Sequence, residues 1–356
     1  MTNAYLLTLV VLCLMFADPC SGADKVLAEW NFSKTSGAQG WSSAGGSLGA
    51  SKADGALTIS GGDQCRLISP LFDIAAIPWQ YVEVEMKSDK SGDAILFYSN
   101  TTEPPYGGFR GGLQTSFRVR GDGQYHRYTI LPCWQTQGKI IHIRIDPPGT
   151  SNAVKTVKIV GFEPNKSSGT GWSFANDSAG WRGIGSLAQP TGRRLLMSGS
   201  RESTMLSPSM DAAAGDLPCL TIRMASGAPH TVLFRWICSD RDGLQSLPIE
   251  VRGGGKMHSY VVDLSKISGW SGRVLGVGIT PTDSADAGAV AVESVTLAAT
   301  PVGPAEIKIT SLGLAEPFAR AGSKAKIIAE ATNIGGEEAR RVLASVTLMV
   351  SGKPKV

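Results

Sequence analysis

The stretch Val119-Arg-Gly-Asp-Gly-Gln-Tyr-His-Arg-Tyr128 returns later in the chain as Val251-Arg-Gly-Gly-Gly-Lys-Met-His-Ser-Tyr260. Further pairs flank this match in the same order, and their spacing drifts as insertions in the loops of a duplicated domain would make it drift. They are Trp30-x-Phe32 with Trp172-x-Phe174, Gly40-Trp41 with Gly180-Trp181, Ser69-Pro70 with Ser207-Pro208, Met86 with Met224, Leu96-Phe97 with Leu233-Phe234, Trp134 with Trp270, and Ile145-x-Pro147 with Ile279-x-Pro281. The sequence therefore predicts two tandem copies of one domain.

Composition places the chain among ordered, strand-rich proteins. Of its 356 residues 42% are hydrophobic and only 18% are charged, which is too apolar for general disorder. Its 43 glycines and 19 prolines stand between short apolar runs and predict many turns. The net charge is only +4, and no dense run of Lys and Arg with interleaved aromatics occurs, so nucleic acid is not an expected partner.

Alternation of apolar and polar residues predicts strands in both copies. It is clear in 81–86, 116–120, 140–145 and 156–160 of the first copy and in 220–224, 231–234, 249–251, 259–262 and 290–295 of the second. No stretch keeps a helical apolar period. Short strands at regular spacing predict an all-β chain with two tandem jelly-roll-type β-sandwiches, 24–164 and 171–300, joined by a polar linker, 165–170.

The N-terminus has the pattern of a secretory signal peptide. Tyr5 to Phe16 is almost wholly apolar but short for a membrane span, and the small residues Ser21-Gly22-Ala23 follow it. We expect residues 1–23 to be cleaved and the protein to be extracellular or at the cell surface, without a membrane span after cleavage.

Four cysteines would remain after cleavage, an even number in an oxidising compartment. Cys219 and Cys238 bracket a predicted hairpin with strands 220–225 and 231–237, which would bring them opposite each other. Either a cross-strand disulfide or two buried free thiols fit this placement. Neither cysteine pair recurs in the other copy, so any bridge would be an accessory to the fold.

Residues 305–356 differ from both repeats. Three strands are predicted there, at 305–310, 325–336 and 341–348, whereas a closed immunoglobulin-like sandwich needs about seven. Their apolar residues would have only one layer to pack against. We therefore expect a partial immunoglobulin-like segment, completed by further sequence and further domains in a longer protein.

These motifs carry a resemblance. The Trp30-x-Phe32, Gly40-Trp41, Ser69-Pro70, Gly121-Asp-Gly-x-x-His126-x-Tyr128 and Ile143-x-Ile-Asp-Pro147 string resembles jelly-roll carbohydrate-binding modules of large secreted bacterial proteins. The second copy departs from it, with Gly254 in place of Asp122 and Thr280 in place of Asp146. Ala331-Thr-Asn-Ile-Gly335 is similar to the start of a CARDB domain, an adhesion-related immunoglobulin-like module. The resemblance implies a polysaccharide partner and the option of a structural calcium ion, although no EF-hand-like loop occurs.

Sugar binding needs flat aromatic rings and hydrogen-bonding side chains. Aromatics that recur in both copies are assigned to the core, and those present once are ligand candidates, because the fold forms without them. Tyr98 follows Phe97, which we assign to the core, so it should point outward. The candidate ligand-binding residues are Trp79, Tyr98, Tyr106, Phe109 and Arg110 in the first copy and Asp240 and Asp242 in the second.

No catalytic or metal-binding motif appears, and no catalytic residue is predicted. His126 and His258 hold the same repeat position, which favours a structural hydrogen bond. We expect a secreted, non-catalytic, carbohydrate-binding-type module array, the N-terminal part of a larger polysaccharide-processing protein whose catalytic domain would follow residue 356. A structural or adhesive spacer that binds a protein partner is the alternative, and a hydrolase a distant third.

Overall fold

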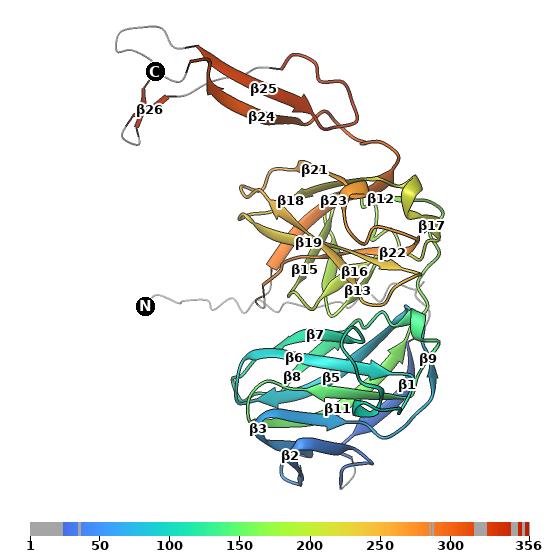
Figure 1. The fold of residues 1–356 in the computed structure, drawn as a ribbon. Helices are drawn as coiled ribbons and strands as arrows, with labels where there is room; N and C mark the ends of the chain where they lie inside the picture. Colours follow the sequence, from blue (N-terminus) through green and yellow to red (C-terminus); the bar gives the residue numbers. More distant parts are fainter. Residues whose placement is uncertain are drawn as a thin grey trace, which may run out of the picture.

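The computed structural model describes residues 24–34, 37–284, 286, 288–316, 326–342, 348–350 and 353–355. The predicted signal peptide lies outside them. The described chain is all-β, with four short 3-10 helices and no α-helix. Three bodies follow one another along the chain: a first sandwich, a second sandwich, and a hairpin that projects from the far end (Figure 1).

Eleven strands build the first sandwich. They are β1 (Lys25–Asn31), β2 (Ser42–Ser51), β3 (Ala56–Ile68), β4 (Ile74–Ala75), β5 (Gln80–Ser88), β6 (Gly92–Ser99), β7 (Gln114–Val119), β8 (His126–Ile130), β9 (Lys139–Ile140), β10 (His142–Asp146) and β11 (Ser151–Gly161), with 3-10 helices η1 (Tyr106–Gly108) and η2 (Gln135–Gln137). The order is β7-β6-β10-β3-β11-β5-β8. Strand β3 belongs to both layers, because its first part pairs with β11 and its last residues pair with β10.

The second sandwich has two separate sheets. Its strands are β12 (Gly171–Ser173), β13 (Arg182–Ile184), β14 (Leu187–Pro190), β15 (Leu195–Gly199), β16 (Thr204–Leu206), β17 (Ala212–Ala213), β18 (Cys219–Ala225), β19 (His230–Cys238), β20 (Gln245–Val251), β21 (His258–Asp263), β22 (Arg273–Thr280) and β23 (Gly288–Ala298), with η3 (Ala214–Asp216) and η4 (Leu264–Lys266). The sheets run β14-β15-β23-β18-β21 and β13-β16-β22-β19-β20. The first sandwich has the same order if β2 and β3 are each split in two.

Local contacts also recur. The backbone N–H of Arg120 donates to the Tyr128 hydroxyl at 3.0 Å, and that of Arg252 donates to the Tyr260 hydroxyl at 2.9 Å. These bonds close the turn that the repeated stretch encodes. Each core also contains an edge-to-face tryptophan pair, at centroid distances of 5.4 Å for Trp30–Trp41 and 5.5 Å for Trp172–Trp181.

The third body is a hairpin of β24 (Ile307–Leu314) and β25 (Ile327–Asn333), and β26 (Leu348–Val350) pairs with β27 (Lys353–Lys355) beyond it. The predicted strand at 341–348 lies largely outside the described residues. The hairpin's apolar side chains are exposed, as in Ile309 and Leu312 at 61% each. Glu306, just before β24, approaches Arg252 at 3.4 Å and His258 at 3.9 Å at the end of the second sandwich.

The predicted hairpin between Cys219 and Cys238 is wrong. β18 pairs with β21 and β23, whereas β19 pairs with β20 and β22, so the connection crosses from one sheet to the other. The two cysteines therefore lie in opposite layers, and both are buried free thiols. The disulfide candidate is overturned, and the free-thiol alternative holds.

The predicted register of β6 is also wrong by one residue. Ala94, Leu96 and Tyr98 face the core, and Phe97 faces outward beneath the Arg144 guanidinium, whose carbon lies 3.9 Å from the ring centroid. Leu96 pairs with Ile145 just as Phe234 pairs with Ile279. Leu96 therefore occupies the position in the first sandwich that Phe234 occupies in the second, and Tyr98 the position of Trp236.

Candidate functional site: the cleft between the sandwiches

An apolar cluster joins the two sandwiches. Its buried members are Leu131, Cys133 and Phe162 from the first sandwich and Ile184, Leu206 and Ile237 from the second. Trp79 packs against this cluster, and its ring reaches the backbone of Gly276 in β22, where an added Cβ would lie 2.7 Å from Trp79 Cη2. Glycine within a strand usually marks a close approach, and here it admits the neighbouring sandwich.

Hydrogen bonds fasten one side of this junction. Asp242 accepts the backbone N–H of Thr136 at 2.9 Å and a bond from the Gln137 side chain. The Gln135 amide donates to the Cys238 and Arg241 carbonyls. These donors belong to the first sandwich, and in the opposite direction the backbone N–H of Gly243 donates to the Cys133 carbonyl at 2.8 Å. The junction is therefore specific, and the two sandwiches are held in one arrangement.

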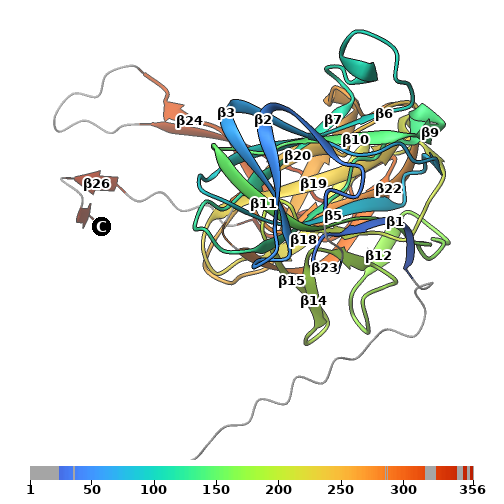
Figure 2. The ribbon, with the colours of Figure 1, turned by 90° about the horizontal axis from the view of Figure 1, so that it is seen from below.

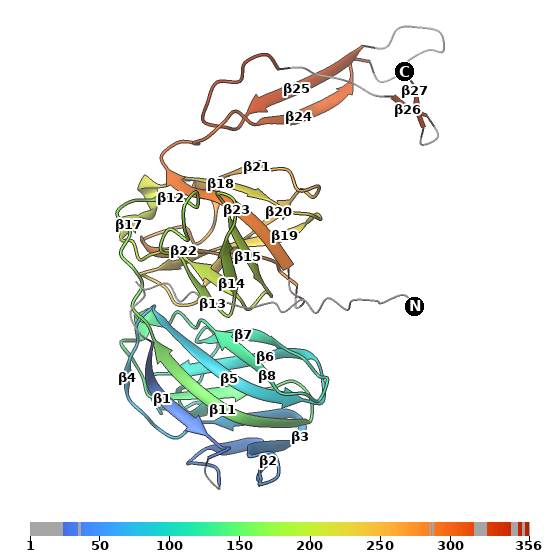
Figure 3. The same cartoon turned by 180° about the vertical axis from the view of Figure 1, so that it is seen from behind.

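A cleft opens beside the apolar cluster. Edge strand β7 of the first sandwich lies beneath β13 of the second (Figure 3). Residues of β7, of β8 and of the β15–β16 connection line the cleft. Two lobes of about 250 Å³ and about 260 Å³ occupy this place, and both are lined by Thr129 and Glu202. Figure 2, seen from below, shows the two sandwiches overlapping along the stack. The lining combines side chains that are more than a hundred residues apart in the sequence.

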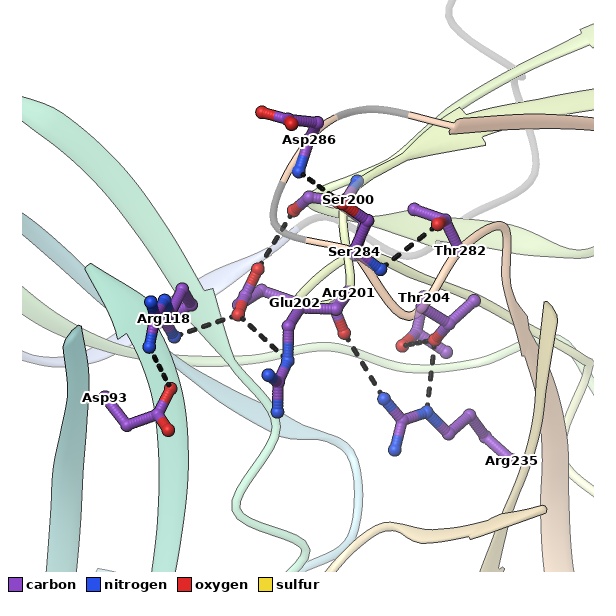
Figure 4. Close-up of polar contacts among 12 residues, drawn as sticks. Asp93, Arg118, Ser200, Arg201, Glu202, Thr204, Arg235, Thr282, Ser284 and Asp286 are labelled. Atoms are coloured by element: carbon purple, nitrogen blue, oxygen red, sulfur yellow. Dashed lines mark hydrogen bonds and ion pairs between the residues drawn. The ribbon is translucent and has the colours of Figure 1, made fainter. Parts of the chain in front are cut away.

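Glu202 lies at the centre of the polar contacts (Figure 4). One carboxylate oxygen accepts the backbone N–H of Arg118 at 2.8 Å and lies 3.6 Å from Arg201 Nε. The other oxygen accepts the Ser200 hydroxyl at 3.1 Å. The Arg118 side chain instead turns toward Asp93, at 3.5 Å. Glu202 thereby satisfies a donor of the unpaired edge of β7.

Arg235 projects from β19 into the other lobe. Its Nε donates to the Thr280 hydroxyl at 3.1 Å and its Nη2 to the Arg201 carbonyl at 3.2 Å (Figure 4). Burial, together with the nearby Arg201 charge, lowers the pKa of Arg235 to about 10. No described carboxylate lies within 4.0 Å of this guanidinium, which donates hydrogen bonds only to neutral oxygens, while the charge of Glu202 acts on it from farther away.

Four sequence-predicted ligand residues do not meet in a site. Tyr98 is fully buried in the core against Trp134, so the prediction that it faces outward is wrong. Phe109 is 3% exposed and stacks on His142 at a centroid distance of 4.2 Å. Tyr106, at 74% exposed, and Arg110 remain on the surface of their loop. The loop packs against the outer sheet face through Phe109, so of its two aromatic rings only that of Tyr106 is exposed.

The other three candidates lie at or near the junction. Trp79 is part of its apolar cluster and Asp242 of its hydrogen-bond set, so both join the two sandwiches. Asp240 sits over Gly272 and lies 3.8 Å from the Arg241 guanidinium. No group of three or more His, Cys, Asp or Glu within the described part of the chain has the arrangement of a metal site.

The cleft residues were missed by the sequence analysis. They come from separate segments, among them Arg118, Arg120 and Arg127 in and beside the repeated stretch, Ser200 to Ser203 in a loop, and Arg235 in a strand. One signal was available. Arg235 interrupts the otherwise apolar run from Val232 to Ile237, and a lone arginine on such a strand indicates a polar environment over that face.

No protein-family profile matches this sequence, and no curated protein matches it. No helix among the described residues is long and apolar enough to cross a membrane.

Distant structural neighbours include carbohydrate-binding modules. The chain is similar to the apo carbohydrate-binding module CBM1 of BiXyn10A, with 13% identity and a TM-score of 0.28 over 38% of this chain and 97% of that one. It is similar to a structure from a study of promiscuous carbohydrate-binding modules of the β-sandwich superfamily, with 10% identity and a TM-score of 0.23 over 64% and 96%. Allantoicase from Saccharomyces cerevisiae matches with 10% identity and a TM-score of 0.23 over 67% and 78%. These values are too low to carry an argument about function.

Proposed function

We propose that the two sandwiches form a non-catalytic glycan-binding unit whose ligand lies in the interdomain cleft. The observation that carries this proposal is the pair of lobes, about 250 Å³ and about 260 Å³, lined by guanidinium, hydroxyl and carboxylate groups from both sandwiches. Such groups hydrogen-bond sugar hydroxyls, and clefts between domains are common ligand sites. The aromatic loop around Tyr106 is not needed in this proposal.

The proposal extends to cellular context. The apolar segment Tyr5–Phe16 followed by small residues supports secretion, and the resemblance of the repeats to binding modules supports a role beside a polysaccharide-processing domain. We place the protein outside the cell or at its surface. The similarity of Ala331–Gly335 to a CARDB domain supports an attachment role for the third body.

A cleft-blocking variant tests the proposal. Thr129 lies on edge strand β8 and lines both lobes, so Thr129→Trp would fill them with an indole while keeping a good strand former. Ser60→Trp, at an exposed position of β3, is the matched control. We expect the full chain to bind at least one polysaccharide on a glycan array, Thr129→Trp to weaken binding at least tenfold, and Ser60→Trp to leave it unchanged.

A spacer role is the second candidate, and the junction itself favours it. Asp242 and the apolar cluster around Phe162 hold the sandwiches in a fixed stack, which is what a rigid extension requires. Absence of binding to any polysaccharide, with the fold intact, would leave this role. Binding that survives Thr129→Trp would move the glycan site away from the cleft.

A further inference from the structure

The cleft has a strong excess of positive charge. Its lining contains five arginines, Arg118, Arg120, Arg127, Arg201 and Arg235, against one carboxylate, Glu202. The whole chain carries only +4, so this concentration is local. Three of the arginines come from the first sandwich and two from the second, and the docking of the sandwiches gathers them.

The ion pairs that these arginines make within the protein are long and therefore weak. Arg127 lies 3.6 Å from Glu83 and 4.0 Å from Glu85. By contrast, Arg144 of the first sandwich donates two hydrogen bonds, of 2.8 Å and 2.9 Å, to the Asp146 carboxylate. Bidentate contacts of that length are the strong form of the arginine–carboxylate pair. The cleft arginines therefore keep donors that an incoming anion could use.

Arg120 and Arg235 have no carboxylate within 4.0 Å among the described residues. The Nη1 of Arg235 makes no hydrogen bond to any described residue, and the other two guanidinium nitrogens donate only to neutral oxygens. A partly buried guanidinium whose counter-charge, Glu202, lies beyond ion-pair distance is incompletely compensated. An anion placed in this lobe would neutralise it.

The remaining lining indicates which kind of anion fits. Ser200 and Thr129 offer hydroxyls beside the arginines, as sugar hydroxyls require. The cleft's aromatic residues, Tyr128 at 7% exposed and Phe117 at 2%, are buried and offer no ring face for stacking bases. These features favour a sugar polymer over a nucleic acid.

We propose that the interdomain cleft selects acidic polysaccharides, whose carboxylate or sulfate groups pair with Arg235 and with the arginines of the first sandwich. The inference rests on the proposed function and narrows its ligand class. Arg235 would pair directly with an anionic group of the ligand, while Arg120 and Arg127 at the open side attract the polymer by their charge.

Matched pairs of polymers test the inference on the full chain. Polygalacturonate is compared with its carboxyl-reduced, neutral counterpart, and dextran sulfate with dextran, by affinity electrophoresis and titration calorimetry. Single-stranded DNA is the third probe. We expect at least one acidic polymer to bind ten times or more tighter than its neutral counterpart and DNA, with an affinity that falls as salt rises.

Two cleft variants and one control locate the effect. Arg235→Gln and the exposed Arg120→Gln should each weaken acidic-polymer binding, by about tenfold or more for Arg235, because Arg235 would pair with an anionic group of the polymer and Arg120 would attract the polymer by its charge. Arg110→Gln, an exposed arginine on the η1 loop, should change nothing. Arg120→Gln removes no described contact of its side chain, so it tests the inference even if Arg235→Gln fails to fold.

The outcomes separate the two proposals. Equal binding of acidic and neutral polymers would overturn the inference and leave glycan binding standing. No binding of any polymer would overturn both. DNA binding as tight as that of the acidic polymer, or equal losses in Arg110→Gln and Arg120→Gln, would replace selective recognition with general attraction to polyanions.

Discussion

Glu202 of the second sandwich caps the backbone N–H of Arg118 at 2.8 Å, on an edge strand of the first sandwich. An uncovered edge offers unpaired donors to any passing strand. Here the Glu202 carboxylate of the neighbouring sandwich accepts one of these donors. The contact therefore links the two sandwiches at the cleft and also covers part of the β7 edge.

Removing that carboxylate should loosen the junction. Glu202→Ala leaves the Arg118 N–H without its partner, and we expect a loss of about 1 kcal/mol in the free energy of unfolding, because an unmade bond to a partly buried donor costs that order. Urea unfolding measures it. Glu103→Ala, at an exposed loop position, should leave stability unchanged, and equal effects of the two changes would contradict the role of Glu202.

A second prediction concerns the glycine that admits Trp79. In Gly276→Ala the new methyl group would lie 2.7 Å from Trp79 Cη2, so we expect a destabilisation of about 1–3 kcal/mol from overpacking. In the background of Trp79→Leu the same change should cost clearly less. A double-mutant cycle by urea unfolding measures the coupling, and strictly additive effects would show that the two residues do not meet.

A third prediction concerns the thiols. Burial raises the pKa of Cys219 and of Cys238, and it raises the pKa of Cys133 to about 12. Because the thiolate is the reactive form, iodoacetamide at mildly alkaline pH should modify these cysteines only after unfolding. Peptide mapping under non-reducing conditions shows which cysteines are modified and whether any two are linked. A linked Cys219–Cys238 peptide would contradict the placement of the two residues in opposite sheets.

Alkaline pH should destabilise the first sandwich. Burial raises the pKa of the Tyr98 phenol, and burial with the nearby Asp24 raises that of Tyr81 to about 12, whereas an unfolded phenol titrates near about 10. The folded state keeps these protons longer, so their stabilisation is complete below about pH 10 and is lost as the pH rises toward 12. The urea midpoint should fall over that range, and less steeply in the Tyr81→Phe/Tyr98→Phe variant. Tyr106→Phe, at an exposed tyrosine, should follow the wild type.

The sequence predicted the all-β class because the signal is local. Alternation along segments such as 81–86 marks one buried and one exposed face, and β5 has that strictly alternating burial. Alternation did not settle β6, where Phe97 and its two neighbours are all apolar. The ring points away from the core because Arg144 covers it, and Arg144 belongs to β10, a strand far away in the sequence that pairs with β6.

The failures are long-range. Two strand sequences separated by a short turn have the same pattern whether the strands pair with each other or belong to different sheets. For this reason the sequence predicted that Cys219 and Cys238 lie close together. The cleft depends on how one folded body docks on another, and Arg118 and Arg235 share no local pattern. Besides Arg235, the sequence contained a hint of the junction in Gly276, a glycine in an apolar strand, but its role becomes clear only when the surface of the first sandwich is known.

The stretch that opens the repeat has a second consequence. Near this stretch each sandwich contacts the body that follows it in the chain: Glu202 accepts the backbone N–H of Arg118, and Glu306 pairs with the Arg252 side chain. Contacts of this head-to-tail kind do not close on themselves. The array therefore has a direction, because each later body presents a glutamate to an arginine-containing edge of the body before it.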